Sequence, residues 1–305
     1  MNRQTKIRFI GIFCALILCL FLFAVGQAQS PIENAVKQLT SDNARGYLQP
    51  MATSFGANLN SGLYHSASIG ELGFTCRFDI VGMATLIGDA EKKYKAVAPQ
   101  PFSQEPIETA TLFGDLGTVA NGPVPGVEYQ FQNGQVKTNY VLFAAPQLTL
   151  GDVYYSQVIF RYVPIPKIGD FPKTTLFGIG ARHNVSHYFP VIPLDLAASF
   201  YYQSFTIGDI FEAKSLSFGA QASKSFSVLT LYGGLQYESS SMDVSYEYEG
   251  LYGAVKGTKM NISMDGKNNF RFTAGLNVNL LVLNLFADVN IGSMTMFSGG
   301  LGFGF

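Results

Sequence analysis

The feature that most constrains this chain is an alternation of apolar and polar side chains with a period of two residues. Between residues 72 and 86 the even positions carry mainly apolar side chains, whereas the odd positions include Arg77 and Asp79. Successive side chains of a β-strand point to opposite faces, so this segment predicts a strand with one apolar face. Most strands of soluble proteins are shorter, whereas a tilted strand of a membrane barrel crosses the bilayer with roughly 9–11 residues and can project beyond it.

The same alternation recurs along the rest of the chain. It is clear in residues 195–203, 215–223, 270–279 and 281–291, and weaker in residues 153–163. Further strands are predicted near residues 58–69, 140–151, 174–182 and 228–238. No strand edge can stay unpaired in lipid, so these strands must close on each other. We therefore expect an all-β, transmembrane antiparallel β-barrel with an even number of strands, between about 10 and 14.

The C-terminal region gives two further signals of a barrel. The apolar positions change from even to odd between Val278 and Leu281, which predicts a two-residue turn at Asn279 and Leu280. The chain then ends on an alternating apolar face: Phe297, Leu301, Phe303 and Phe305. This pattern resembles the assembly signal of outer-membrane barrels, in which the last strand pairs with the first. It implies the barrel-assembly machinery and outer-membrane lipid as partners.

Composition favours a strand-rich chain in an apolar medium over a soluble β-sandwich. Charged residues make up 13% of the chain and aromatic residues 14%, with 32 glycines. This charged fraction is about half of what soluble domains carry. The net charge is −1, so there is no basic surplus that would hold a nucleic acid.

The N-terminus has the three parts of a secretory signal peptide. Arg3, Lys6 and Arg8 precede an apolar run over residues 9–25, and a cleavage site with small residues ends at Ala28. Residues 1–28 are therefore predicted to be removed, and the mature protein is expected in the outer membrane of a Gram-negative cell. A permanent membrane anchor is the alternative. Bulky residues precede Cys14 and Cys19, which argues against a lipoprotein.

An amphipathic helix is predicted at the start of the mature chain, within residues 29–54. Ser30, Pro31 and Glu33 form a helix start, and apolar residues then recur at helical spacing. We expect this short N-terminal helix to end before Pro50. It either packs on the periplasmic rim of the barrel or enters the lumen as a plug. Residues 55–305 are assigned to the barrel.

Two long segments interrupt the alternation, residues 88–138 and residues 239–267. The first is rich in Lys and Pro and is too irregular to predict as a domain; the second is predicted to be a hairpin that extends above the membrane. Long connections of outer-membrane barrels face the outside, and short turns face the periplasm. Both segments are therefore expected at the cell surface.

Charged residues of both signs fall on the predicted lumen face. They are Arg77, Asp79, Arg161, Arg182, Asp195, Arg271 and Asp288. Buried charges need partners, so one interpretation is a network that braces the lumen. The alternative is a polar constriction that selects what passes through the barrel.

No catalytic site, metal site or cofactor is predicted, and the protein is not expected to be an enzyme. The segment from His183 to His187 also contains Asn184 and Ser186, but on a strand the two histidines would lie about 13 Å apart. This segment is interpreted as a strand end near the lipid headgroups. A lipid hydrolase built on it is the alternative. Cys76 lies on an apolar face, where a thiol is inert.

Several short segments resemble an uncharacterised family of outer-membrane β-barrels from Bacteroidota-type bacteria. The segments are Gly46-Tyr47-Leu48-Gln49-Pro50, Gly56-Ala57-Asn58-Leu59-Asn60-Ser61-Gly62, Ala145-Pro146-Gln147-Leu148, Phe177-Gly178-Ile179-Gly180-Ala181-Arg182-His183-Asn184, Pro193-Leu194-Asp195-Leu196, Tyr232-Gly233-Gly234-Leu235 and Gly300-Leu301-Gly302-Phe303-Gly304-Phe305. The resemblance covers most of the mature chain and implies no assigned activity. In architecture alone, the chain is also similar to the long-chain fatty-acid transporter class, which implies passage of small apolar molecules.

The predicted barrel, helix and long connections suggest two main functions. The first is a passive channel or transporter for a small apolar ligand, with the N-terminal helix and residues 88–138 as gates. A barrel of about twelve strands has room for a narrow or plugged lumen. The second is a structural or surface-interaction barrel with an occluded lumen, whose long connections bind partners.

Overall fold

The computed structural model describes residues 34–169, 172–189, 192–249 and 255–304. The predicted signal peptide, the predicted helix start at Ser30 and the terminal Phe305 lie outside these residues. Among the helices within the described ranges, none is long and apolar enough to span a bilayer.

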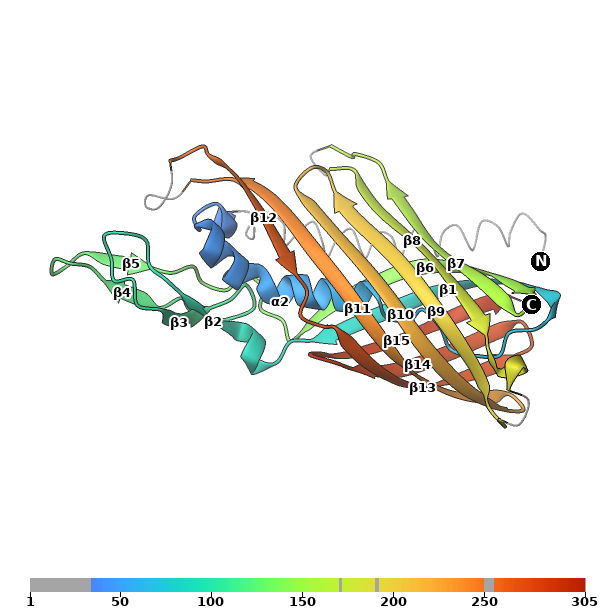
Figure 1. Cartoon of the computed structure of the whole chain (residues 1–305). Helices are drawn as coiled ribbons and strands as arrows, with labels where there is room; N and C mark the ends of the chain where they lie inside the picture. Colours follow the sequence, from blue (N-terminus) through green and yellow to red (C-terminus); the bar gives the residue numbers. More distant parts are fainter. Residues whose placement is uncertain (1–33, 170–171, 190–191, 250–254, 305) are drawn as a thin grey trace.

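Ten antiparallel strands close into a barrel, which confirms the predicted fold class at the lower end of the expected strand number (Figure 1). The strands are β1 (Leu72–Leu86), β6 (Tyr140–Val153), β7 (Ser156–Ile165), β8 (Thr174–Asn184), β9 (Asp195–Ile207), β10 (Phe211–Phe226), β11 (Leu229–Glu247), β13 (Phe270–Leu280), β14 (Leu283–Ile291) and β15 (Thr295–Gly304). Their order around the barrel is β10-β9-β8-β7-β6-β1-β15-β14-β13-β11, and β11 also pairs with β10, so every barrel strand has two neighbours.

The two faces of each strand follow the predicted alternation. On β1, Phe74 is exposed on the outside, whereas Asp79 and Thr85 are buried on the inside. β15 pairs with β1, and Phe303 lies opposite Phe78 on the outer face. An exterior of Phe, Leu, Val and Tyr side chains suits a wall that contacts lipid rather than water.

The turn between β13 and β14 lies two residues later than predicted. The last cross-strand pair is Leu280 with Leu283, so the turn residues are Leu281 and Val282 instead of Asn279 and Leu280. Leu281 adopts a left-handed backbone with φ of 58°. The change of the apolar positions from even to odd numbers predicts a turn of two residues but not where it lies. A turn that lies two residues later leaves the same side chains on the outer face.

The connections divide the barrel into two ends. The turn end holds the start of β1, the end of β15 and the brief turns after β6, β10 and β13. The loop end holds the connections after β1 and β11, which are residues 87–139 and the segment that leads to β13. In outer-membrane barrels, long connections generally face the outside and short turns the periplasm, so we expect the same orientation here.

Residues 88–138, which we call the head, are more ordered than the sequence predicted. They contain the 3-10 helix η1 (Asp89–Lys92) and two small sheets, β2 (Lys93–Ala96) with β3 (Ile107–Ala110) and β4 (Val119–Asn121) with β5 (Glu128–Gln130). Ala96, Ala98, Phe102, Ala120 and Phe131 form a separate hydrophobic core. These residues have no regular spacing in the sequence, and the strands have only three or four residues, so no periodicity predicted them.

The second long connection is a hairpin. β11 continues beyond its pairing with β13 and pairs with β12 (Lys259–Asp265) at the loop end. Figure 1 shows this hairpin and the head at the same end of the barrel. We call the segment from Ser240 to Asp265 the hairpin.

The N-terminal helix runs further than expected. Helix α2 (Ser41–Leu59) includes Pro50 in its interior, although its predicted end lay before that residue. A proline removes one backbone hydrogen bond from a helix, and here contacts with the surrounding strands outweigh that loss. The predicted strand over residues 58–69 is also wrong, because residues 60–71 follow the helix without regular structure and lead directly to β1.

Leu276 tests whether the outer wall contacts lipid. It lies midway along β13 with its side chain exposed on the outside. Leu276→Arg should lower the free energy of unfolding by about 2–4 kcal/mol in lipid vesicles, the cost of an arginine near the bilayer midplane. Val124→Arg, on the exposed tip between β4 and β5, is the control and should change little. Denaturant titration in vesicles measures both, and equal effects would contradict a lipid-facing β13.

Candidate functional site

Residues 41–71, which we call the plug, pass through the barrel from the loop end to the turn end (Figure 1). At the loop end, the Asn58 side chain donates to the Val141 carbonyl at 2.9 Å and accepts from Thr85 at 2.8 Å. Towards the turn end, the Ala67 amide donates to the Ser223 hydroxyl at 2.9 Å. The plug therefore contacts the wall along the whole lumen.

The loop-end half of the lumen is apolar around Phe55. The Phe55 ring of α2 lies 5.3 Å from the Phe143 ring, 5.1 Å from Phe205 and 5.4 Å from Phe211 (centroid distances). Val81 and Met83, on the lumen face of β1, are buried in the same cluster. Apolar residues on the predicted lumen faces indicate this apolar region in the sequence. We missed it because we expected a polar interior.

Arg161 of β7 anchors the end of helix α2. Its side chain is 1% exposed. The guanidinium donates to the carbonyl oxygens of Leu59 at 3.1 Å, Ser61 at 2.9 Å and Gly62 at 3.1 Å. It also donates to the Gln147 side chain at 3.0 Å. One wall side chain therefore holds three carbonyls where the helix ends.

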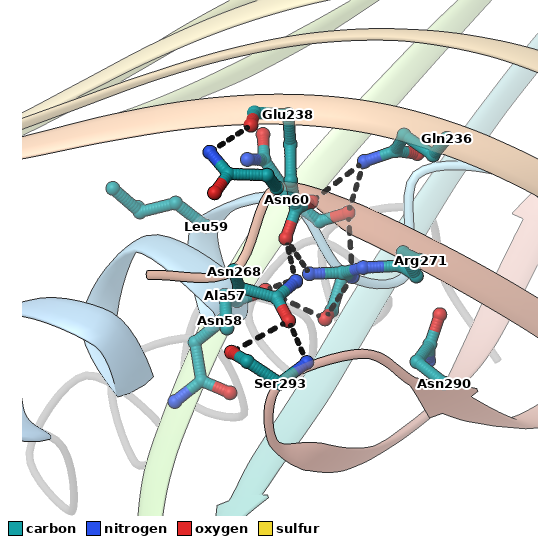
Figure 2. Close-up of polar contacts among 12 residues, drawn as sticks. Ala57, Asn58, Leu59, Asn60, Gln236, Glu238, Asn268, Arg271, Asn290 and Ser293 are labelled. Atoms are coloured by element: carbon teal, nitrogen blue, oxygen red, sulfur yellow. Dashed lines mark hydrogen bonds and ion pairs between the residues drawn. The ribbon is translucent and has the colours of Figure 1, made fainter. Parts of the chain in front are cut away.

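Arg271 of β13 anchors the same helix end from another part of the wall, as Figure 2 shows. It donates to the Ala57 carbonyl at 2.7 Å, the Asn60 carbonyl at 2.9 Å and the Ser61 hydroxyl at 2.6 Å. Its ionic partner is Glu238 of β11, at 3.1 Å. The last turn of α2 contains no basic residue. The wall arginines supply the positive charge that stabilises the negative end of a helix dipole.

Glu238 is fixed by neutral partners as well as by Arg271. The Gln236 side chain donates to it at 3.1 Å, and Asn268 donates to the same oxygen that Arg271 contacts. Asn268 in turn accepts from the amide and hydroxyl of Ser293 (Figure 2). The network thus joins the wall strands to the connection between β14 and β15.

The turn-end half contains the other predicted charges. Arg182 donates to the Ser66 carbonyl of the plug at 2.7 Å and also contacts the Gln157 side chain. Arg77 pairs with Asp79 at 3.1 Å. His65 of the plug lies 3.9 Å from Asp79 and stacks on Phe286, with ring centroids 4.7 Å apart.

Besides the Arg77–Asp79 pair, two more of the seven predicted charges lie apart from the three arginines that bind the plug. Asp288 is buried and accepts from the Tyr232 hydroxyl at 2.8 Å, and from Asn290 and Ser298. Asp195 is half-buried at the start of β9, at the turn-end rim. The structure therefore joins Arg161, Arg182 and Arg271 through the plug backbone.

Sequence analysis missed Gln147 and Glu238, which bind two of these arginines. Both fall within strands that were predicted, near residues 140–151 and 228–238. Assigning a face to every polar residue of those strands would have placed them in the lumen. Their pairing with particular arginines depends on strand order, which the sequence does not specify.

The segment from His183 to His187 lies at the turn end of β8. His183 faces outward, with Nδ1 2.9 Å from the Ser156 hydroxyl and Nε2 3.2 Å from the Tyr188 hydroxyl. His187 stacks on Tyr155 in the same aromatic group, near the 3-10 helix η2 (Ser186–Tyr188). The second nitrogen of His183 contacts a phenol, where a catalytic triad has a carboxylate or amide. Within the described ranges, no group of three His, Cys, Asp or Glu side chains could hold a metal.

The chain matches one family model and is distantly similar to solved barrel structures. A family model described as "Family of unknown function (DUF6588)" matches residues 5–305. No curated protein matches the chain. Among solved structures, Ail, the attachment invasion locus protein of Yersinia pestis, is 10% identical over 76% of this chain and 97% of that chain, with a TM-score of 0.29.

Two porins are similar at the same level. A mutant of the Rh. blastica porin is 9% identical over 76% of this chain and all of the porin, with a TM-score of 0.17. A BenF-like porin from Pseudomonas fluorescens Pf-5 is 8% identical over 76% and 98%, with a TM-score of 0.19.

Arg271→Met tests the anchor. The substitution leaves Glu238 buried without its ionic partner, so we expect a loss of about 3–5 kcal/mol in the free energy of unfolding. The double variant R271M/E238Q should recover part of that loss, because the unpaired charge is removed. A double-mutant cycle from denaturant titration measures the coupling. Additive effects would mean that the two side chains do not act as a pair.

Proposed function

Because the chain belongs to DUF6588, a family of unknown function, we propose its function from its geometry: a self-plugged outer-membrane barrel that carries a surface-exposed head for interaction with partners. The family match confirms the predicted resemblance to an uncharacterised family. The Bacteroidota-type origin, the similarity to the fatty-acid transporter class and the cleaved signal peptide stay predictions.

The observation that carries this proposal is the way the plug is held. Arg161, Arg182 and Arg271 are buried and donate to backbone carbonyls or hydroxyls of the plug. Removing the plug would leave three arginines with unfilled donors in the lumen, which is costly for buried charged groups. The plugged state is therefore the stable state of the barrel, and an open channel would need these bonds to break together.

The head and the hairpin hold the outer end of the plug. The Asn43 side chain of α2 donates to the Val97 carbonyl at 2.8 Å and accepts from the Val97 amide at 3.2 Å. The Tyr47 hydroxyl donates to the Asn133 carbonyl at 2.8 Å. From the hairpin, the Tyr246 hydroxyl donates to the carbonyl of Leu39, two residues before the plug, at 3.0 Å. The head is thus fastened to the plug as well as to the barrel strands.

Close packing reinforces this junction. A side chain at Gly46 would clash with the Tyr94 ring of β2, so the helix and the head approach as closely as a glycine allows. Burial there raises the pKa of the Tyr94 phenol above its usual range. The head therefore has a fixed position on the loop end, which suits a surface that presents residues to a partner.

Exposed apolar side chains on the head favour an interaction role. Leu116 is 80% exposed and Val124 59% exposed, and Val119 and Val127 of the β4–β5 hairpin are also exposed. These residues lie outside the barrel strands, so lipid does not cover them. Exposed apolar side chains that gather on one surface in water are typical of binding surfaces.

Gated passage of a small apolar solute is the second candidate function. The aromatic cluster of Phe55, Phe143, Phe205 and Phe211 favours it, because a local rearrangement of α2 would open an apolar cavity in the lumen. The helix and the head would be the gates. No enzymatic activity is proposed, and the expected absence of one stays a prediction.

Conductance across a planar lipid bilayer distinguishes an occluded barrel from an open one. We expect the wild-type protein to be silent and a variant lacking residues 34–71 to conduct, because the plug fills the lumen. Replacement of residues 119–130 by a short Gly-Ser link is the control and should stay silent. Steady conductance of the wild type would contradict the proposal, and conductance only with an added apolar solute such as toluene would favour gated passage.

Surface labelling tests the exposure of the head. In a Cys76→Ala background, Val124→Cys on the head should react with a membrane-impermeant maleimide on intact cells. Leu281→Cys in the turn between β13 and β14 should react only after lysis, because the turn end faces the periplasm. The reverse pattern would show that the head faces the periplasm.

A further inference from the structure

An apolar groove lies on the outer wall near the loop end of β13 and β14. It has a volume of about 720 Å³. Its sides are Phe218, Leu235, Tyr237, Phe270, Phe272 and Ile291. Ala198 and Ala220 leave room at its base, because neither fills the space between the larger side chains. The groove is open towards the surface that contacts lipid.

A polar slot lies beside helix α2 at the same end of the barrel. It consists of two adjoining hollows of about 270 Å³ and 560 Å³, and Arg45, Gln49 and Lys267 line both. Lys93 and Ser293 line the first hollow and Asn269 the second. Arg45 and Gln49 are one helical turn apart, so they belong to the same face of α2.

The slot and the groove meet along two short segments of the chain. Asn269 lines the slot and the next residue, Phe270, lines the groove. Ile291 lines the groove, and Ser293, two residues later, lines the slot. Both segments lie at the loop end, where β13 begins and β14 ends. The polar slot therefore adjoins the outer edge of the apolar groove.

We propose that the slot and the groove together bind one phosphorylated glycolipid of the outer leaflet. Its phosphate lies between Arg45 and Lys267, and one of its acyl chains lies in the groove. Arginine and lysine are the side chains that bind phosphate oxygens, and clusters of them beside a membrane bind anionic headgroups. Only a ligand with both an anionic head and an apolar tail complements both features.

The other charges of the slot favour a sugar headgroup. Glu91 and Asp265 also line it. Arg45 lies 3.4 Å from Asp42, and Lys93 lies 2.9 Å from Glu108. Carboxylates repel phosphate but accept hydrogen bonds from hydroxyl groups. A phosphorylated sugar supplies both an anion for the cations and hydroxyl donors for the carboxylates.

This inference needs the barrel to lie in a membrane with its loop end outside, but it does not depend on whether the lumen opens. Arg45 belongs to the plug helix, whereas Lys267 precedes β13 of the wall. A bound glycolipid would therefore connect the plug to the wall from the membrane side.

Native mass spectrometry of the full chain in phosphatidylcholine nanodiscs that contain diphosphoryl lipid A tests the proposal. The wild type should retain one lipid A on release into detergent. The double variant R45Q/K267Q should retain roughly tenfold less, because both phosphate contacts are lost. Ala220→Phe fills the groove and should also reduce retention. Lys137→Gln, outside the slot, is the matched control and should bind as the wild type does.

Three outcomes would overturn the proposal. Equal retention by R45Q/K267Q and the wild type would exclude the phosphate contacts. Equal retention of dephosphorylated lipid A would exclude a headgroup charge requirement. If Ala220→Phe retains lipid A normally while glucose-1-phosphate displaces it, the slot binds a soluble sugar phosphate and the groove is not involved. Thermal unfolding of each variant in detergent shows that a lost ligand does not reflect a lost fold.

Discussion

The structure depends on the contact between two wall arginines and the end of helix α2. A helix leaves its last carbonyl groups without internal partners, and a helix that ends inside a barrel cannot use bulk water instead. Arg161 donates to the carbonyls of Leu59, Ser61 and Gly62. Arg271 donates to the carbonyls of Ala57 and Asn60 and to the Ser61 hydroxyl. The planar guanidinium suits this task because it offers five donors in a fixed arrangement. The path of the plug and the closed lumen follow from these contacts.

The two halves of the lumen match the two parts of the plug. A helix satisfies most of its backbone groups internally, so α2 can lie among Phe143, Phe205 and Phe211 without a penalty. Residues 60–71 have no regular structure, and their backbone groups need partners from the wall. Those partners are in the polar half, where Arg182 donates to the Ser66 carbonyl. The point at which the helix ends therefore coincides with the point at which the lining changes from apolar to polar.

The sequence predicts the wall better than its contents, and the reason is physical. Lipid outside and a largely polar interior impose a two-residue alternation, so the faces of Phe74 and Asp79 could be read directly. The helix beyond Pro50, the head core around Phe131 and the pairing of Arg271 with Glu238 depend on residues distant in the chain. All seven charges were placed on the lumen face from their parity. That Arg161, Arg182 and Arg271 hold a plug rather than surround a constriction depends on the path of residues 60–71, most of which fall in the strand that was wrongly predicted over residues 58–69.

The connectivity makes the plug part of the barrel rather than an addition to it. Helix α2 begins at the loop end, and residues 60–71 deliver the chain to β1 at the turn end. β1 then pairs with β15 to close the ring, so the strand that completes the barrel is continuous with the plug. At the other end, Lys37 lies 3.5 Å from Glu249, and its carbonyl accepts from the Glu249 amide at 2.7 Å. A segment that is fixed at both ends and bound by buried arginines between them can open the lumen only by a local rearrangement of α2, not by leaving the barrel.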